Sequence, residues 1–178
     1  MATNFPTSLD SYTTKVNNVD TIDAANVNDL QDAMVQVETI LGASSKRRTS
    51  WTPSFQWATV GTSTWTYTTR VGFYAQFGSI VYLSAFITAT PTIGTGTGQL
   101  SITGLPVVPT SPITSNFQPI AISNCSGFTT YPTNGLIWNT ATEIRLYRST
   151  NVADTLTTAH VTSGTAIQVL FSAFYFHA

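Results

Sequence analysis

Two hydrophobic patterns divide the chain, and the change from one to the other falls near residue 50. Before it, apolar residues recur at helical spacing. After it, short β-branched and aromatic runs alternate with Thr and are separated by Gly, Pro and Asn. Helical spacing places side chains on one face of a helix, whereas alternation places them on one face of a strand. The pattern therefore predicts one N-terminal helix followed by a β domain.

The helical pattern predicts a helix over residues 24–41, with Asp23 as its N-cap and Gly42 as the residue that ends it. Its main apolar residues are spaced three and four apart, as in the a/d seam of a coiled coil. They are Val27, Leu30, Met34, Val37 and Leu41. Ala33 and Ile40 widen this stripe, and two heptads are fewer than a coiled-coil assignment normally requires. The stripe fits either self-association or packing on the chain's own β domain.

The remaining N-terminal residues form two polar segments. Residues 1–22 are rich in Asn, Thr, Ser and Asp and lack periodicity, which predicts an extended segment that is ordered only when it docks. Residues 43–50 (ASSKRRTS) read as a linker, with too few basic residues for a nucleic-acid patch. The N-terminus lacks the basic and apolar regions of a signal peptide. No stretch reaches the roughly 20 apolar residues of a membrane span, so no membrane insertion is expected.

The β domain is predicted to span residues 51–178. Its predicted strands cover residues 62–69, 79–90, 99–105, 117–123, 135–138, 143–148 and 166–176. In the second of these, one face holds Val81, Leu83 and Ile87, and the other holds Ile80, Tyr82 and Phe86. Short strands separated by turn signals, without a second helix, predict an antiparallel β-sandwich or barrel.

Composition narrows the range of functions. Charged residues make up 8% of the 178 positions, against roughly 25% in average soluble domains, whereas 33 positions are Thr. Threonine suits the outward face of a strand, so its abundance needs no site to explain it. A net charge of −1 provides no basic surface for nucleic acid. A single cysteine, Cys125, excludes an intrachain disulfide framework.

The β domain is poor in catalytic and metal-binding residues. Its carboxylates are Glu143 and Asp154, and nothing in the sequence places them at the roughly 5–9.5 Å of a glycosidase pair. His160 and His177 have no partner at metal-ligand spacing. Residues 94–98 (GTGTG) lead into a strand and not a helix, so they predict a hairpin loop and not a phosphate-binding loop. We therefore expect no enzyme activity, no metal and no cofactor.

Binding is the remaining class of function. Aromatic side chains offer flat faces to sugar C–H groups, while Asn and Arg supply hydrogen bonds. The loop-rich region near residues 124–139 and the hairpin that follows it contain the candidate glycan-binding residues. These are Tyr131, Asn134, Trp138, Arg145 and Tyr147. The alternative is that Trp138 and Tyr147 belong to the core or to a subunit interface.

Two segments resemble bacteriophage tail- and head-fibre proteins. Residues 4–42 contain NFPTSLDSY and then VDTIDAANVNDLQDAMVQVETILG, similar to a leader and helix that recur at the N-terminus of phage structural proteins. Residues 65–106 contain WTYTTRVGFYAQFGSIVYLSAFITAT and then GTGTGQLSITGLP, similar to strings in the β-sandwich of fibre tips. The second segment is the more specific, because its turns, long strand and Gly-Leu-Pro exit occur in order.

The resemblance implies a homotrimeric virion protein, made in the host cytoplasm and displayed on the particle surface. Residues 1–22 would anchor it to a capsid, neck or tail protein, and residues 23–42 would form a short coiled coil. Residues 51–178 would form a jelly-roll-like antiparallel β-sandwich that attaches to a host cell-surface glycan. The predicted helix is only about 27 Å long, at 1.5 Å per residue. A structural head or neck fibre, or a capsid decoration protein, is therefore the alternative, and a fibre-borne glycan hydrolase is the least favoured.

Overall fold

A computed structural model of the chain describes residues 24–38, 48–110, 117–138 and 142–177. The chain divides into two compact units, residues 1–47 and residues 48–178. The predicted anchoring segment, residues 1–22, lies outside the described residues, as do the predicted N-cap Asp23 and the helix-ending Gly42.

The first unit contains the predicted helix. α1 spans Ala24–Glu38, so its start agrees with the prediction, while the expected last turn with Leu41 lies outside the described residues. The seam residues within α1 are the exposed Val27, Leu30 and Met34 and the half-buried Val37. Within the described part of this unit, most of the predicted seam is therefore on the surface.

The second unit, called the β unit below, is built from antiparallel strands. They are β1 (Thr49–Trp51), β2 (Ser54–Thr59), β3 (Thr64–Phe77), β4 (Ile80–Thr92), β5 (Thr97–Thr103), β6 (Phe117–Ser126), β7 (Asn134–Trp138), β8 (Glu143–Tyr147) and β9 (Ile167–Phe176), with the short 3-10 helix η2 (Thr158–His160) before β9. Hydrogen bonds join them in the order β1-β3-β4-β9-β6-β7-β8-β5-β2. The prediction of a mainly β, antiparallel chain with one N-terminal helix is confirmed.

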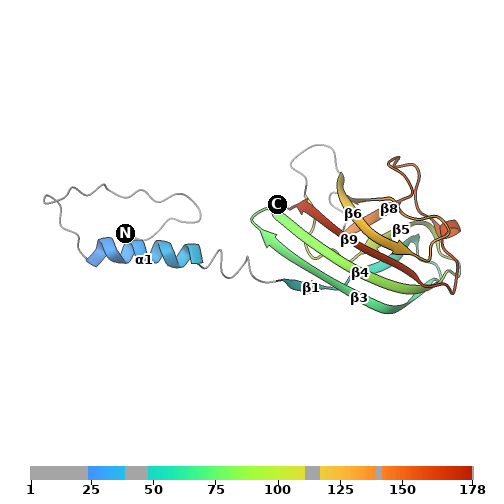
Figure 1. The fold of residues 1–178 in the computed structure, drawn as a ribbon, viewed down its shortest axis with the longest axis horizontal. Coiled ribbons are helices and arrows are strands. Elements are labelled where there is room, and N and C mark those ends of the chain that lie inside the picture. Colours follow the sequence, from blue (N-terminus) through green and yellow to red (C-terminus); the bar gives the residue numbers. More distant parts are fainter. Residues whose placement is uncertain (1–23, 39–47, 111–116, 139–141, 178) are drawn as a thin grey trace. The chain divides into compact units, whose positions relative to one another are not determined.

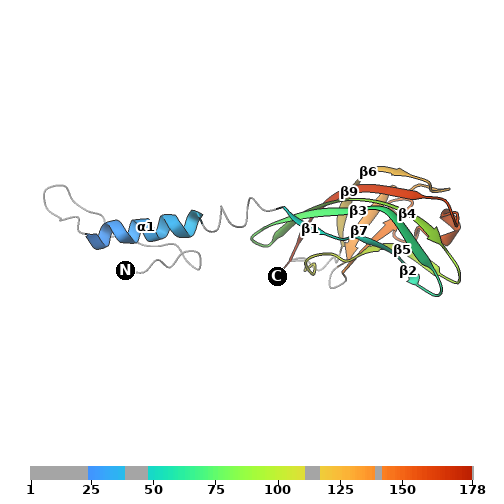
Figure 2. The same cartoon turned by 90° about the horizontal axis from the view of Figure 1, so that it is seen from below.

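The predicted sandwich does not appear as two separate sheets. The nine strands form a single sheet that curls into a half-barrel (Figure 1). Figure 2 shows β9 and β6 on one side of the curl and β5 and β2 on the other. The physical reason is the pairing of β6, which bonds to β9 along one edge and to β7 along the other. This strand joins the two walls into one sheet.

The core lies inside the curl and uses one of the two apolar faces into which the alternation divides β4. The inward side chains Val81, Leu83 and Ile87 are fully buried, whereas Ile80, Tyr82 and Phe86 face outward. β9 repeats the pattern, and its buried side chains are Ile167, Val169, Phe171, Ala173 and Tyr175. Removing these side chains from water is the main favourable term in folding this unit.

β1 and β2 were not predicted, and β3 is longer than expected. Residues 49 and 50, assigned to the linker from sequence, belong to β1. The predicted strand at residues 62–69 covers only the first part of β3, because the register shifts between Tyr67 and Thr69. Such a bulge interrupts the alternation by which a strand is recognised.

The two ends of the sheet meet at a corner. β1 and β2 are the first and last strands in the sheet order, yet only Thr52 and Pro53 separate them in the chain. On β3, the Tyr67 hydroxyl accepts a hydrogen bond from the Phe55 N–H of β2 at 2.8 Å and donates to the Phe55 carbonyl at 3.4 Å. A side chain thus satisfies both backbone groups of an edge-strand residue where β2 passes β3.

Candidate functional site

Four of the five predicted glycan-binding residues lie on the β7–β8 hairpin, and three of them, Trp138, Arg145 and Tyr147, are joined by contacts. β7 and β8 pair antiparallel, with Leu136 opposite Arg145 and Asn134 opposite Tyr147. Because side chains alternate along a strand, Trp138, Arg145 and Tyr147 share the outward face of the hairpin. Their contacts join these three side chains on the hairpin.

A cation–π contact forms the centre of this cluster. The Arg145 guanidinium lies over the Trp138 ring, with Cζ 4.0 Å from the ring centroid. The same guanidinium donates from Nε to Glu143 Oε1 at 2.6 Å. Both charged side chains are partly exposed, so the ion pair contributes little stability. Its effect is to hold the guanidinium in place over the indole.

Two further aromatic side chains fix the Trp138 ring. Phe117 of β6 packs against it at 75°, with ring centroids 4.5 Å apart. Trp138 Nε1 donates a hydrogen bond to the Tyr147 hydroxyl at 3.3 Å. Tyr147 is only 1% exposed and does not belong to the main core cluster. Tyr147 therefore supports the Trp138 indole from inside the β unit and is not placed to touch a ligand.

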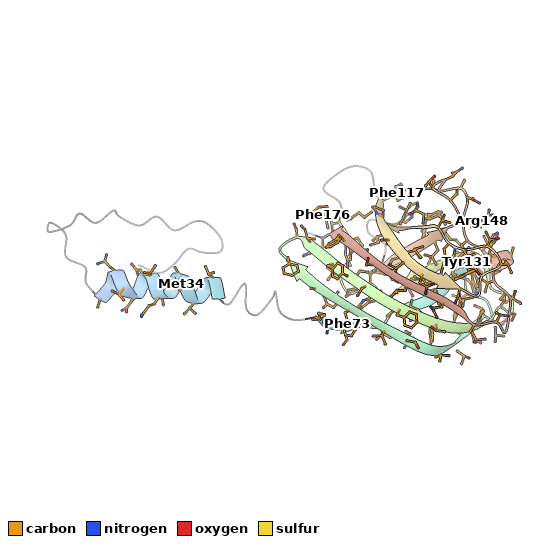
Figure 3. All side chains as sticks on the ribbon, in the orientation of Figure 1. Met34, Phe73, Phe117, Tyr131, Arg148 and Phe176 are labelled. Atoms are coloured by element: carbon orange, nitrogen blue, oxygen red, sulfur yellow. The ribbon has the colours of Figure 1, made fainter. Side chains whose placement is uncertain are left out.

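The other two candidates do not join the Trp138 contacts. The Asn134 side-chain oxygen accepts a hydrogen bond from the Gly135 N–H at 2.8 Å, so this oxygen is already engaged by the next residue of β7. Tyr131 is 53% exposed, and Figure 3 shows it toward one end of the β unit, apart from Phe117. We therefore define the candidate site as the indole cluster, which consists of Phe117, Trp138, Glu143, Arg145 and Tyr147.

Phe117 and Glu143 were not among the predicted binding residues. Glu143 could have been found, because it is two residues from Arg145 and so shares its face of the strand. Phe117 reaches Trp138 through the pairing of β6 with β7, in which these two residues stand opposite each other. No local pattern in the sequence encodes that pairing.

The carboxylates and histidines of the β unit have structural partners. Glu143 pairs with Arg145, and Asp154 pairs with Arg148 in the loop after β8. His160 Nδ1 accepts a hydrogen bond from the Thr157 N–H at 3.0 Å, at the start of η2. Each acid is thus held by an arginine close to it in sequence.

Metal and thiol chemistry find no support in the described parts of the chain. No three His, Cys, Asp or Glu side chains in those ranges gather closely enough to hold a metal ion. The described helix is too short and too polar to cross a membrane. Burial raises the pKa of the Cys125 thiol, whose Sγ lies 3.8 Å from the Pro132 carbonyl. A raised pKa lowers the fraction of reactive thiolate.

Comparison with known proteins gives no match: no protein-family model, curated protein or solved structure matches this chain. The site must therefore be understood from its own chemistry. It presents a half-buried indole, with a guanidinium on one face and a carboxylate beside it. This combination suits neutral polar ligands with apolar C–H faces better than strongly charged ones.

Proposed function

We propose that this chain is a bacteriophage virion fibre protein that attaches to a host cell-surface glycan through its β unit. Three copies associate through the α1 seam, residues 1–22 bind another virion protein, and the β unit is displayed on the particle surface. The resemblance of residues 4–42 and 65–106 to fibre proteins supports this proposal. So does the division of the chain into a helical unit and a β unit.

The observation that carries the proposal is the exposed apolar stripe of α1. Leu30 and Met34 are 59% and 56% exposed, on a helix whose other described residues are mostly polar. Burying such a side chain contributes about 1.5–3 kcal/mol. A bundle of helices buries the stripes of every copy at once, which is the usual role of a heptad seam.

The half-barrel would serve as the fibre tip. We infer that it is a variant of the jelly-roll-like β-sandwich of such tips, with its two walls joined through β6. The corner at Thr52 and Pro53 supports this inference, because strands that change sheets at bends are typical of packed β walls. Few charges and many Thr residues suit a particle-surface domain that binds through shape and hydrogen bonds.

The indole cluster is the proposed glycan contact. Sugar C–H groups would pack on the free part of the Trp138 indole, and sugar hydroxyls would bond to the outward groups of Arg145 and Glu143. Because Arg145 and Glu143 neutralise each other, a neutral polysaccharide would meet no strong electrostatic barrier.

One observation favours the alternative of a structural head or neck fibre, or a capsid decoration protein. Arg145 covers one face of Trp138, and Tyr147 is buried, so the aromatic surface left for a sugar is small. A glycan hydrolase has less support, because Glu143 and Asp154 are each held by an arginine.

An array of bacterial capsular polysaccharides and lipopolysaccharides tests the attachment proposal with the full chain. We expect Trp138→Ala to weaken retention by at least tenfold, or about 1.4 kcal/mol. The matched control is Val152→Ala, which changes an exposed apolar side chain in the loop after β8. Thermal unfolding of both variants checks that the fold is kept. Retention of Trp138→Ala equal to that of the control would reject the indole cluster as the contact. Absence of any binding, with the chain still found in virions, would favour the structural alternative.

Deleting residues 1–22 tests the anchoring assignment. We expect the shortened chain to associate normally but to be absent from purified virions. Normal incorporation would contradict the role of this segment.

A further inference from the structure

The outer surface of β3, β4 and β9 is apolar. Its side chains come from alternate positions along the three strands and are Val71, Phe73, Phe77, Ile80, Tyr82, Phe86, Leu170, Phe174 and Phe176. We call this set the outer apolar face. Tyr82 stands directly opposite Phe174 in the ladder, with ring centroids 4.8 Å apart, and Ile80 stands opposite Phe176. The face is thus a continuous patch across neighbouring strands.

Much of this face is open to solvent within the β unit. Seven of its side chains are 36% to 66% exposed, with Phe174 the most exposed. At about 200 Å² for an aromatic side chain, the exposed fractions amount to roughly 600 Å² of apolar surface. This equals the largest patches of typical monomers, at about 300–600 Å². It approaches the roughly 800 Å² that each partner buries in a standard interface.

The charge of the face identifies the kind of partner it fits. Its remaining outward positions in the same stretches are Ala75, Ser84 and Ser172, so none of them is charged. The Arg48 guanidinium lies over the Phe73 ring, with Cζ 5.0 Å from its centroid. A charged ligand would need charged groups at the centre of such a site, where the face carries the hydroxyls of Ser84 and Ser172. A second copy of the same surface needs none, and the strand positions of the face would bring no like charges together, while Arg48 lies at the β1 edge of the face.

The chain enters the β unit beside this face. β1 pairs with β3 at Thr49 and Tyr74, within the stretch of β3 that carries the face. Figure 1 shows the start of β1, the β3–β4 turn and the C-terminal end of β9 at the same end of the β unit. Copies linked through the preceding helix would therefore have their outer apolar faces at a high effective concentration, on the order of millimolar for a short linker.

We propose that the outer apolar face is a contact between the β units of neighbouring copies of this chain. The proposal rests on the proposed association through α1, and it adds a second interface that the helix alone does not provide. In the assembled fibre, Phe174 and its neighbours are then covered by the same surface region of another copy. The rival occupant is the apolar stripe of α1 from the same chain.

Thiol labelling of the full chain tests this contact. Ser172 stands at the centre of the face, opposite Ser84, and Ser172→Cys changes its size little. A Cys125→Ser background removes the natural thiol. The control is Thr150→Cys, at an exposed position in the loop after β8. Maleimide labelling rates are compared between the associated chain and chains that also carry Leu30→Asp in the seam, with the mass of each preparation measured by sedimentation.

We expect the thiol of Ser172→Cys to react at least about tenfold more slowly in associated chains than in monomers, since interface cores exclude solvent. The thiol of Thr150→Cys should react equally in both. Protection that persists in a Leu30→Asp chain that remains associated also supports the contact.

Three results would overturn the proposal, and they separate it from the fibre assignment. Equal labelling of Ser172→Cys in associated chains and monomers would reject the outer-face contact while leaving association through α1 intact. Protection in a preparation that sediments as a monomer would assign the face to the chain's own helix. A monomer at every concentration would reject both the contact and the proposed trimer.

Discussion

Tyr67→Phe removes a single oxygen atom from the corner where β2 passes β3. That hydroxyl accepts a hydrogen bond from the Phe55 N–H at 2.8 Å and donates to the Phe55 carbonyl at 3.4 Å. Phe55 is only 3% exposed, so water has little access to replace the lost partner. Leaving a buried donor unsatisfied costs about 1–3 kcal/mol. We expect the free energy of unfolding to fall by about 2 kcal/mol, because the ring itself and its packing are kept.

Urea unfolding followed by tryptophan fluorescence measures this change, at one fixed protein concentration because association also affects stability. The matched control is Tyr131→Phe, which removes the same atom from an exposed ring. Its effect should stay within about 0.5 kcal/mol, as at most surface positions. If Tyr67→Phe is no more destabilising than this control, the hydroxyl does not stabilise the contact between β2 and β3, and our account of the corner of the half-barrel is wrong.

Two further predictions concern packing and pH. Gly72→Ala would place a Cβ in steric conflict with the Trp51 ring, so we expect the free energy of unfolding in urea to fall by about 1–3 kcal/mol, and an unchanged midpoint would contradict this packing. Burial raises the pKa of Tyr175 to about 12, and its hydroxyl donates to the Val107 carbonyl at 3.0 Å. Because the pKa in the unfolded chain is about 10, the folded state keeps this proton longer. Its contribution to stability is complete below pH 10 and is lost between about pH 10 and 12. Tyr175→Phe should therefore lose less stability than the wild-type chain over that range, and an equal loss would refute this reasoning.

The alternation of side chains predicted the β4 and β9 strands and divided β4 into the two faces that the structure shows, but it did not say which face is buried. The hydrophobic alternation identifies these two strands because each has one face in the core and its alternation is not interrupted. It missed β1 and β2, since a three-residue strand and a run broken by Pro53 leave too short a period to recognise. It also could not show that β6 joins both walls. That outcome depends on β6 bonding to β9 and β7 at once, which no local pattern reveals.

The candidate site was predicted in part for similar reasons. Trp138 and Arg145 belong to one hairpin, so a short-range register brings them together. Tyr131 was grouped with them only because it is near in sequence, and the fold places it toward one end of the β unit, apart from Phe117. Tyr147 is buried, as the alternative to glycan binding expected, although outward positions on a hairpin are usually exposed.

The outer apolar face and the indole cluster are close to each other in the β unit. β6 pairs with β9 at Ala121 and Ser172, and the first residue of β6, Phe117, contacts Trp138. If copies meet through the outer apolar face, the indole cluster lies near the edge of that contact. Association and attachment would then be coupled, and variants of either surface should be examined for both properties.

Self-association is the claim on which the fibre proposal depends, and sedimentation equilibrium of the full chain tests it most directly. We expect a mass three times the 19.2 kDa of one chain. Leu30→Asp, which places a charge in the exposed seam of α1, should shift the mass toward 19.2 kDa. A wild-type mass of 19.2 kDa at every concentration would contradict the trimer.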